Sequence, residues 1–258
     1  MQQHVLPEFI EYLESRREPA FERLRRMYDI TRQFPDFSNF RLGPNAFDRT
    51  PMDWIAAIDS ADGSLIAHGI ATRIQWDGDA VLLRGWQRVV RRAYDDLVVR
   101  RQPCNTLVGL FIKVEDASRE QGWAGRVIAA MKELAARAGL TSVVIPLRLP
   151  TAYEREHADT PYPEFAFQTR EDGEYRDHWL RLHVRLGARV IGHSVTSHQH
   201  AMNVDDFHHY FEAEAVASSG YCLAQRNGEW YRPYVDVERD CVVINEGCVW
   251  VQHAVDRR

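Results

Sequence analysis

The sequence predicts a mixed α/β protein, and the prediction rests on one strand–loop–helix–strand unit near the middle of the chain. Residues 107–114 form an apolar run of strand length, and residues 141–147 form a second run rich in β-branched side chains. Between these runs, Val127, Ile128 and Met131 recur at helical spacing. A chain of 258 residues, 45% of them apolar, can bury about 70 to 75% of its unfolded surface, which suits one enlarged domain or two closely packed ones.

The segments before this unit are predicted to form helices and then two strands. Residues 7–32 place apolar side chains on one helical face, so we expect residues 1–53 to form helices that frame a cleft. Residues 54–58 and 65–74 are typical of antiparallel strands, because the turn between them contains an Asp-Gly pair, a strong hairpin signal. A helical insertion with six arginines is expected over residues 80–102, ending before a proline.

The segments after the unit are more varied. Residues 149–175 contain three prolines and no lasting periodicity, so we expect a long loop that could close over a substrate. A helix at residues 177–186 and a strand at residues 188–197 follow. We therefore expect a core at residues 54–200, with residues 201–258 packed on it as an elaboration containing extra strands.

Composition limits the class of protein. The formal net charge of -5 argues against general affinity for nucleic acid, because neutralising phosphates requires a basic surface. The four cysteines show no C-x-x-C spacing and the chain begins with no basic, apolar leader, so we expect a reduced, cytoplasmic protein. No run approaches the roughly 18 apolar residues of a membrane span, and we expect no membrane partner.

The candidate ligand site is the segment that joins the first apolar run to the helix. The first N–H groups of a helix lack intrahelical partners and carry partial positive charge, so they can hold a diphosphate. The alternative is that the two glycines only let the helix start close to the sheet. Neither G-x-G-x-x-G nor a P-loop pattern is present. The candidate residues are Arg119, Glu120, Gln121, Gly122, Trp123, Ala124 and Gly125.

The pattern R-x-x-G-x-A at residues 119–124 resembles the pyrophosphate-binding motif of the GCN5-related N-acetyltransferase (GNAT) superfamily. The resemblance covers about residues 54–200 and implies a splayed mixed sheet with helices on both faces. It also implies acetyl-CoA or another acyl-CoA as co-substrate, with backbone groups of Ile112 and Val114 binding the pantetheine arm. Trp123 departs from the pattern, and so bulky a side chain must point away from the phosphates.

Two residues are candidates for proton transfer. GNAT relatives often place a tyrosine four residues before a glycine, where it meets the departing thiolate, and His183 holds that position before Gly187. We expect His183 to act as general acid or base; the alternative is a histidine that is hydrogen-bonded in the core or exposed. Glu115 follows the motif strand and could deprotonate the amine through a water, or could simply be a loop carboxylate.

Three further residues are candidates for binding the acceptor. Arg148 ends the second strand of the unit and, with Tyr153, could hold a substrate carboxylate through its forked donors; the alternative is a surface salt bridge. Trp179 is assigned to the same substrate set. His198 and His200 would share one face of a strand, but no cysteine or carboxylate completes a recognisable spacing, so we expect no metal site.

These observations predict an N-acyltransferase that passes an acyl group, acetyl above all, from coenzyme A directly to an amine of a small polar metabolite. A first alternative is an acyl-carrier-protein donor docked on Arg88, Arg91 and Arg92, although nearby Asp95 and Asp96 also suit an ordinary solvated face. A second alternative is a non-catalytic module that only binds coenzyme A. The C-terminal strands leave a homodimer open.

Overall fold

The computed structural model describes residues 50–58, 65–78, 85–149, 157, 160–214, 216–226 and 228–255. The expected N-terminal helices up to residue 49 lie outside the described residues, as do the turn at residues 60–63 and Tyr153. The predicted core is described almost completely, so the candidate site can be built from it.

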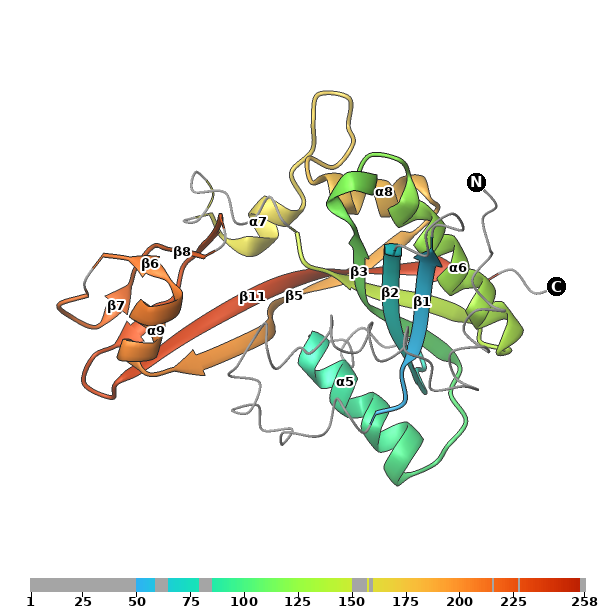
Figure 1. Cartoon of the computed structure of the whole chain (residues 1–258), viewed down its shortest axis with the longest axis horizontal. Helices are drawn as coiled ribbons and strands as arrows, with labels where there is room; N and C mark the ends of the chain where they lie inside the picture. Colours follow the sequence, from blue (N-terminus) through green and yellow to red (C-terminus); the bar gives the residue numbers. More distant parts are fainter. Residues whose placement is uncertain are drawn as a thin grey trace.

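An eight-stranded sheet forms the centre of the structure (Figure 1). Its order is β1-β2-β3-β4-β11-β10-β7, and β5 pairs along the other edge of β11. Only β3 and β4 are parallel, and the helix that joins them is the crossover that parallel neighbours need. The strands are β1 (Asp53–Ile58), β2 (Leu65–Ile74), β3 (Thr106–Val114), β4 (Ser142–Leu147), β5 (Arg189–Met202), β7 (Gly220–Tyr221), β10 (Tyr234–Asp236) and β11 (Cys241–Ala254).

The sheet splays between β3 and β4, as the family resemblance implied. The two strands pair only from Thr106 opposite Ser142 to Val108 opposite Val144, and then separate. At the same level β3 contains one extra residue, Leu110, relative to β2. An extra residue of this kind bends a strand and increases its twist, so the bulge accounts for the point at which the gap opens.

Helices cover both faces of the sheet (Figure 1). α6 (Trp123–Arg137) packs Val127 and Met131 against one face, where α8 (His178–Arg185) adds Leu180. α5 (Trp86–Tyr94) packs Val89 and Val90 against the opposite face, over Trp250. The expected arrangement of helices on both faces is therefore confirmed.

The predicted insertion is shorter than residues 80–102. Its helix begins at Trp86, continues as one π-helical turn, Asp95–Val99, and ends before Pro103 as expected. Residues 79–84 lie outside the described part of the chain. Asp96 is fully buried beneath this turn and accepts hydrogen bonds from the Gln75 N–H at 2.9 Å and from Arg92 at 2.8 Å. The buried carboxylate thus ties the helix to β2.

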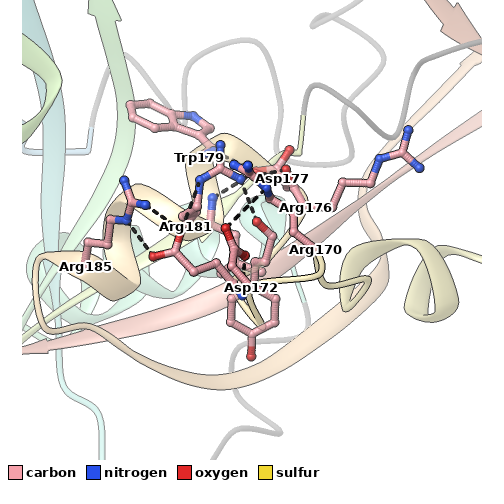
Figure 2. A network of polar contacts seen from close by, with 10 residues as sticks. Arg170, Asp172, Arg176, Asp177, Trp179, Arg181 and Arg185 are labelled. Carbon is pink, nitrogen blue, oxygen red and sulfur yellow. Dashed lines mark hydrogen bonds and ion pairs between the residues drawn. The ribbon is translucent and has the colours of Figure 1, made fainter.

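The predicted loop at residues 149–175 contains regular structure where it is described. α7 (Tyr162–Ala166) starts after a proline, and Thr169 bridges to Tyr175 across a tight turn. Figure 2 shows arginines of α8 reaching over this turn: Arg181 donates to the Tyr175 carbonyl oxygen at 2.6 Å, and Arg185 makes two hydrogen bonds to Glu174. The expectation of an irregular loop is wrong for this part of the segment, because contacts with the following helix α8 order it.

The boundary expected at residue 200 does not match the strand pairing. β5 runs on to Met202, and β11 lies between β4 and β5, so the C-terminal segment supplies an inner strand of the main sheet. Both strands extend beyond β1, β2, β3 and β4 to a small module (Figure 1). The module has its own apolar cluster, which includes Phe207 and Ile244. Its further elements are α9 (Val204–Tyr210), β6 (Glu212–Ala213), β8 (Ala224–Arg226) and β9 (Glu229–Tyr231).

Candidate functional site

The joint between β3 and α6 has the backbone that the sequence predicted. β3 ends at Val114, and a 3-10 turn, Asp116–Ser118, leads to Gly122, which precedes the first residue of the helix. Gly122 has φ of 77°, a left-handed conformation that costs an L-residue roughly 1 to 2 kcal/mol. A Cβ built on Gly122 would meet nothing within 4 Å among the described atoms, so the space above the loop is open to a ligand.

The start of α6 can accept an anion. Its first turn holds no acidic side chain, and the N–H groups of Trp123, Ala124 and Gly125 are the ones a helix leaves without intrahelical partners. Trp123 is 8% exposed and belongs to the main apolar cluster, so its side chain points away from the loop as required. Arg126 stacks on the Trp123 ring at 4.4 Å, which leaves a basic group beside the helix start.

The other loop side chains are less organised for binding. Arg119 and Asp116 form an ion pair at 2.7 Å, and both side chains are mostly exposed. Glu120 has a positive φ of 63°, and the Gln121 amide donates to the Ala117 carbonyl oxygen at 3.3 Å. The geometry therefore favours backbone groups over side chains as the anion ligands.

The gap between β3 and β4 lies along the β3 residues that precede this loop. Ile112 and Val114 lie beyond the last residue that pairs with β4, and both are partly buried against the main apolar cluster. Gly109 allows close packing where the two strands part, because a Cβ there would come within 3.0 Å of Ile145 and Met131 side-chain atoms. The β3 backbone after the bulge is thus the edge along which an extended chain could lie.

Glu115 lies directly after this edge and is held in place. Its N–H donates to the Ile66 carbonyl oxygen at 2.9 Å, and its carboxylate lies 3.4 Å from Lys113 Nζ. The side chain is 30% exposed. A role for Glu115 in proton transfer stays a prediction.

His183 lies in the core. It is 0% exposed, and its Nδ1 lies 2.9 Å from Nε2 of His253, a residue of β11 that is 1% exposed. Burial lowers the pKa of His183 to about 3, with His253 adding to the effect, and lowers the pKa of His253 to about 4. This placement matches the alternative of a hydrogen-bonded core histidine, because a neutral, buried ring does not meet a substrate in this conformation.

Trp179 packs against His183. It lies in the first turn of α8, and its ring meets the His183 ring edge-on with centroids 5.4 Å apart. Asp177 caps this helix by accepting from the Trp179 N–H at 2.8 Å, so the local geometry is accounted for by helix capping and packing. A contact between Trp179 and substrate stays a prediction.

The guanidinium of Arg148 is paired with carboxylates of the same chain. Its guanidinium donates to Glu229 at 2.5 Å and to the Tyr231 hydroxyl at 2.9 Å, and lies 3.3 Å from Glu246. The expected role of holding a substrate carboxylate is therefore not supported by the described contacts, since two protein carboxylates already surround this arginine. Burial raises the pKa of Tyr231, which keeps its hydroxyl protonated as a donor to Glu229.

His198, which the sequence analysis considered only as a metal ligand, and Glu246, which it did not consider, lie next to Arg148. His198 of β5 is opposite Glu246 of β11, and its Nδ1 is 3.1 Å from Glu246 Oε2. Trp86 connects this pair to β3, because its indole Nε1 donates to the Leu110 carbonyl oxygen at 3.1 Å and its ring meets the His198 ring edge-on at 5.5 Å. No spacing in the sequence signals this group, since its members come from four elements.

The basic face of α5 is only partly available for a partner. Arg88 and Arg91 are exposed, whereas Arg92 is 30% exposed and paired with the buried Asp96. Docking of a carrier protein on this helix stays a prediction.

The described residues form neither a metal-binding cluster nor a membrane-spanning helix. They contain no group of three or more histidine, cysteine, aspartate and glutamate side chains placed to hold a metal ion. The helices in this part of the chain are each too short or too polar to cross a bilayer.

Comparisons with known proteins point to N-acetyltransferases. No protein-family model matches the sequence. Over 145 residues the chain is 29% identical to the arginine N-acetyltransferase avaD of Aspergillus versicolor, covering 53% of this chain and 49% of the relative. The chain thus spans about half the length of this curated relative.

Solved structures with similar folds include the loading GNATL domain of CurA from Lyngbya majuscula, at 16% identity and a TM-score of 0.45, covering 78% of this chain and 76% of that one. The GphF GNAT-like decarboxylase in complex with isobutyryl-CoA is 18% identical, with a TM-score of 0.46, covering 79% of this chain and 78% of that one.

Proposed function

We propose that this protein is a member of the GCN5-related N-acetyltransferase superfamily and that it transfers an acyl group from an acyl-CoA thioester to an amine. One observation carries the proposal. The splayed edge of β3 and the glycine that opens α6 lie in succession, at Leu110 and Gly122, so one extended ligand could place its diphosphate on the helix and its thioester in the gap.

Acyl transfer from a thioester to an amine requires little of the protein beyond positioning the two reactants. The amine must lose a proton, its lone pair must attack the thioester carbon, and the C–S bond must break to release a thiolate that takes up a proton. Backbone N–H groups of Ile112 and Val114, on the edge of β3 that β4 leaves, are the candidates for holding the pantetheine arm and polarising the carbonyl.

Transfer is direct in this proposal, with no acyl-enzyme intermediate. A cysteine nucleophile needs an accessible thiolate. Burial raises the pKa of Cys104 and Cys222 and raises that of Cys248 to about 12, so these thiols stay protonated near neutral pH.

The acceptor is proposed to be a small, positively charged amine. Glu229 and Glu246 place two carboxylates against the single guanidinium of Arg148 at the open end of β4. The matched relative is named for arginine, so arginine and other basic amino acids head the list of acceptors to test.

A carrier protein is the second candidate donor, favoured by the exposed Arg88 and Arg91 on α5. Reversing both charges should then lower turnover with an acyl-carrier-protein thioester and leave turnover with acetyl-CoA unchanged. Equal losses with the two donors would contradict this docking surface.

The proposed function is tested by ligand-induced stabilisation. Acetyl-CoA at about 100 times its Kd should stabilise the protein by about 2.7 kcal/mol, measured as a rise in Tm. Gly122→Glu should abolish the rise, because it puts a carboxylate at the anion site. Gly139→Glu is the matched control, since Gly139 ends the same helix with a φ of 69° and equally open space.

Two results would contradict the proposal. The first is that acetyl-CoA and longer acyl-CoAs leave the Tm unchanged. The second is that Gly122→Glu and Gly139→Glu respond equally to the ligand. Release of coenzyme A in the presence of a panel of amines, followed with a thiol reagent, then identifies the acceptor.

A further inference from the structure

β3 carries a lysine on the edge that is proposed to hold the acyl-CoA arm. The Glu115 N–H donates to the Ile66 carbonyl oxygen of β2, so alternation along the strand also turns the Lys113 N–H toward β2. The N–H groups of Ile112 and Val114 then point to the other side, where β4 no longer pairs with β3. Lys113 therefore lies between the two backbone groups that are candidates for binding the arm.

The Lys113 side chain lies on the open face of this edge. Ile112 and Val114 pack against the main apolar cluster beneath α6, and side chains alternate between the two faces, so Lys113 points away from α6. It shares its face with Phe111, two residues earlier, which is 39% exposed. The Lys113 side chain is itself 42% exposed, so its amine is accessible at this end of β3.

Glu115 is the carboxylate that faces the Lys113 amine. Its Oε1 lies 3.4 Å from Lys113 Nζ, and this oxygen is buried without a hydrogen-bond partner in the described part of the chain. The amine must lose a proton before it can act as a nucleophile, and a neighbouring carboxylate can accept that proton. The pair thus places a nucleophile and a proton acceptor side by side.

Side-chain amines are rare in this protein. Among its 32 basic residues only Lys113 and Lys132 are lysines, and all the others are arginines, whose guanidinium stays charged. Lys132 lies within α6, well after the helix start. Lys113 is therefore one of only two lysine amines that the sequence offers to a bound thioester.

The distance between the lysine and the proposed ligand suits the length of its side chain. A ligand bonded to the β3 edge would run at the spacing of a neighbouring strand, about 4.8 Å from the β3 backbone. The flexible four-carbon stem of a lysine can span such a distance. Lys113 would have to leave only a partly exposed ion pair, which is a weak interaction.

We propose that Lys113 is a self-acylation site, to which bound acyl-CoA transfers its acyl group; this inference rests on the proposed function. The Lys113 ammonium loses one proton, for which Glu115 is the neighbouring acceptor, and the freed lone pair attacks the thioester carbon. The C–S bond breaks, and the thiolate of coenzyme A takes up a proton. The products are an amide at Nζ, coenzyme A and one proton released to water.

The test follows an isotopically labelled acetyl group from acetyl-CoA onto the unmodified protein, with no amine added, by peptide mass spectrometry. Lys132 is the internal control, and a free acylating reagent, sulfosuccinimidyl acetate, gives the intrinsic labelling ratio of the two lysines. Acetyl-CoA should raise the ratio of Lys113 to Lys132 labelling roughly 10-fold or more above that value, because binding positions the thioester. The rate constant should not depend on protein concentration, since the transfer occurs within one molecule.

Variants and a competitor separate bound from free acetyl-CoA. Gly122→Glu, at the proposed anion site, should return the ratio to the value of the free reagent, whereas Gly139→Glu should keep the raised ratio. Excess coenzyme A should act like Gly122→Glu, because it competes for the same site. Lys113→Arg keeps a positive charge beside Glu115, so it should lose the label at this residue and keep the acetyl-CoA-dependent rise in Tm.

Two results would overturn the self-acylation site. The first is that acetyl-CoA labels Lys113 and Lys132 in the same ratio as the free reagent does. The second is that a raised ratio persists both in Gly122→Glu and in the presence of excess coenzyme A.

The two levels of the proposal fail in different ways. The absence of any acetyl-CoA stabilisation in the unmodified protein refutes the proposed function, and self-acylation with it. A rise in Tm with acetyl-CoA, together with no preferential labelling of Lys113, refutes self-acylation and leaves the proposed function standing.

Discussion

Acidification is expected to destabilise this fold through histidines that are buried in the uncharged form. His183 and His253 are 0% and 1% exposed, and burial lowers their pKa values to about 3 and about 4. His68 of β2 is also 0% exposed, and burial, with a smaller effect of Lys113, lowers its pKa to about 4. In the unfolded chain the pKa of each of these rings is about 6.5. Below that pH the unfolded state binds more protons, so stability falls as pH falls.

The magnitude follows from the difference between the two states. Between about pH 6.5 and the lowered pKa, each buried histidine costs about 1.4 kcal/mol of unfolding free energy per pH unit. At about pH 5 the loss is about 2 kcal/mol per ring, hence about 4 kcal/mol for His183 and His253 together and about 6 kcal/mol with His68. A typical domain is stable by only about 5 to 15 kcal/mol, so the effect should bring the protein close to unfolding.

Urea unfolding at a series of pH values, followed by far-UV circular dichroism, measures this loss. A double variant, His183→Gln with His253→Gln, should be less stable near neutral pH, yet should lose only about one third as much stability on acidification, since one of three rings remains. His208→Gln, an exposed control, should keep the full pH dependence. If the unmodified protein lost no more stability between about pH 6.5 and pH 5 than the double variant, the reasoning would be refuted.

Two further substitutions test the packing that positions the site. Asp96→Ala should cost about 3 to 5 kcal/mol in urea unfolding, because it removes a fully buried carboxylate and leaves Arg92 without its partner; a loss under about 1 kcal/mol would mean that water reaches this pair. Gly247→Ala should cost about 1 to 3 kcal/mol, because its Cβ would come within 2.6 Å of the Tyr162 ring. Gly220→Ala, whose Cβ meets nothing within 4 Å, should stay within about 0.5 kcal/mol, and equal effects of the two would contradict the proposed contact.

The central unit could be predicted from the sequence because its signals are local. An apolar run, a glycine and a helical repeat of apolar residues are enough to predict β3, the loop at Gly122, α6 and β4, and the structure confirms each within one or two residues. Steric bulk also predicted that Trp123 points away from the loop, into the sheet or toward solvent, and the structure places its side chain in the core.

Segments whose order depends on side-chain contacts or on the choice of partner strand could not be predicted in this way. The turn near Tyr175 has no periodicity of its own and is held by arginines of α8. The strand β11 was expected in an elaboration packed on the core, yet it pairs with β4 and β5 in the main sheet. Hydrophobic alternation predicts that a segment is a strand but does not specify its neighbours.

The contacts between titratable side chains, like the order of the strands, could not be predicted from local sequence. From sequence alone, His183 was a candidate for proton transfer, but its contact with His253, 70 residues away, places it in the core. His198 and Glu246 are 48 residues apart and meet only through the register of β5 and β11. Local sequence thus determined the loop between β3 and α6, because backbone conformation and helix polarity act over a few residues. Tertiary structure alone decided which titratable groups meet, because burial and strand register depend on the whole chain.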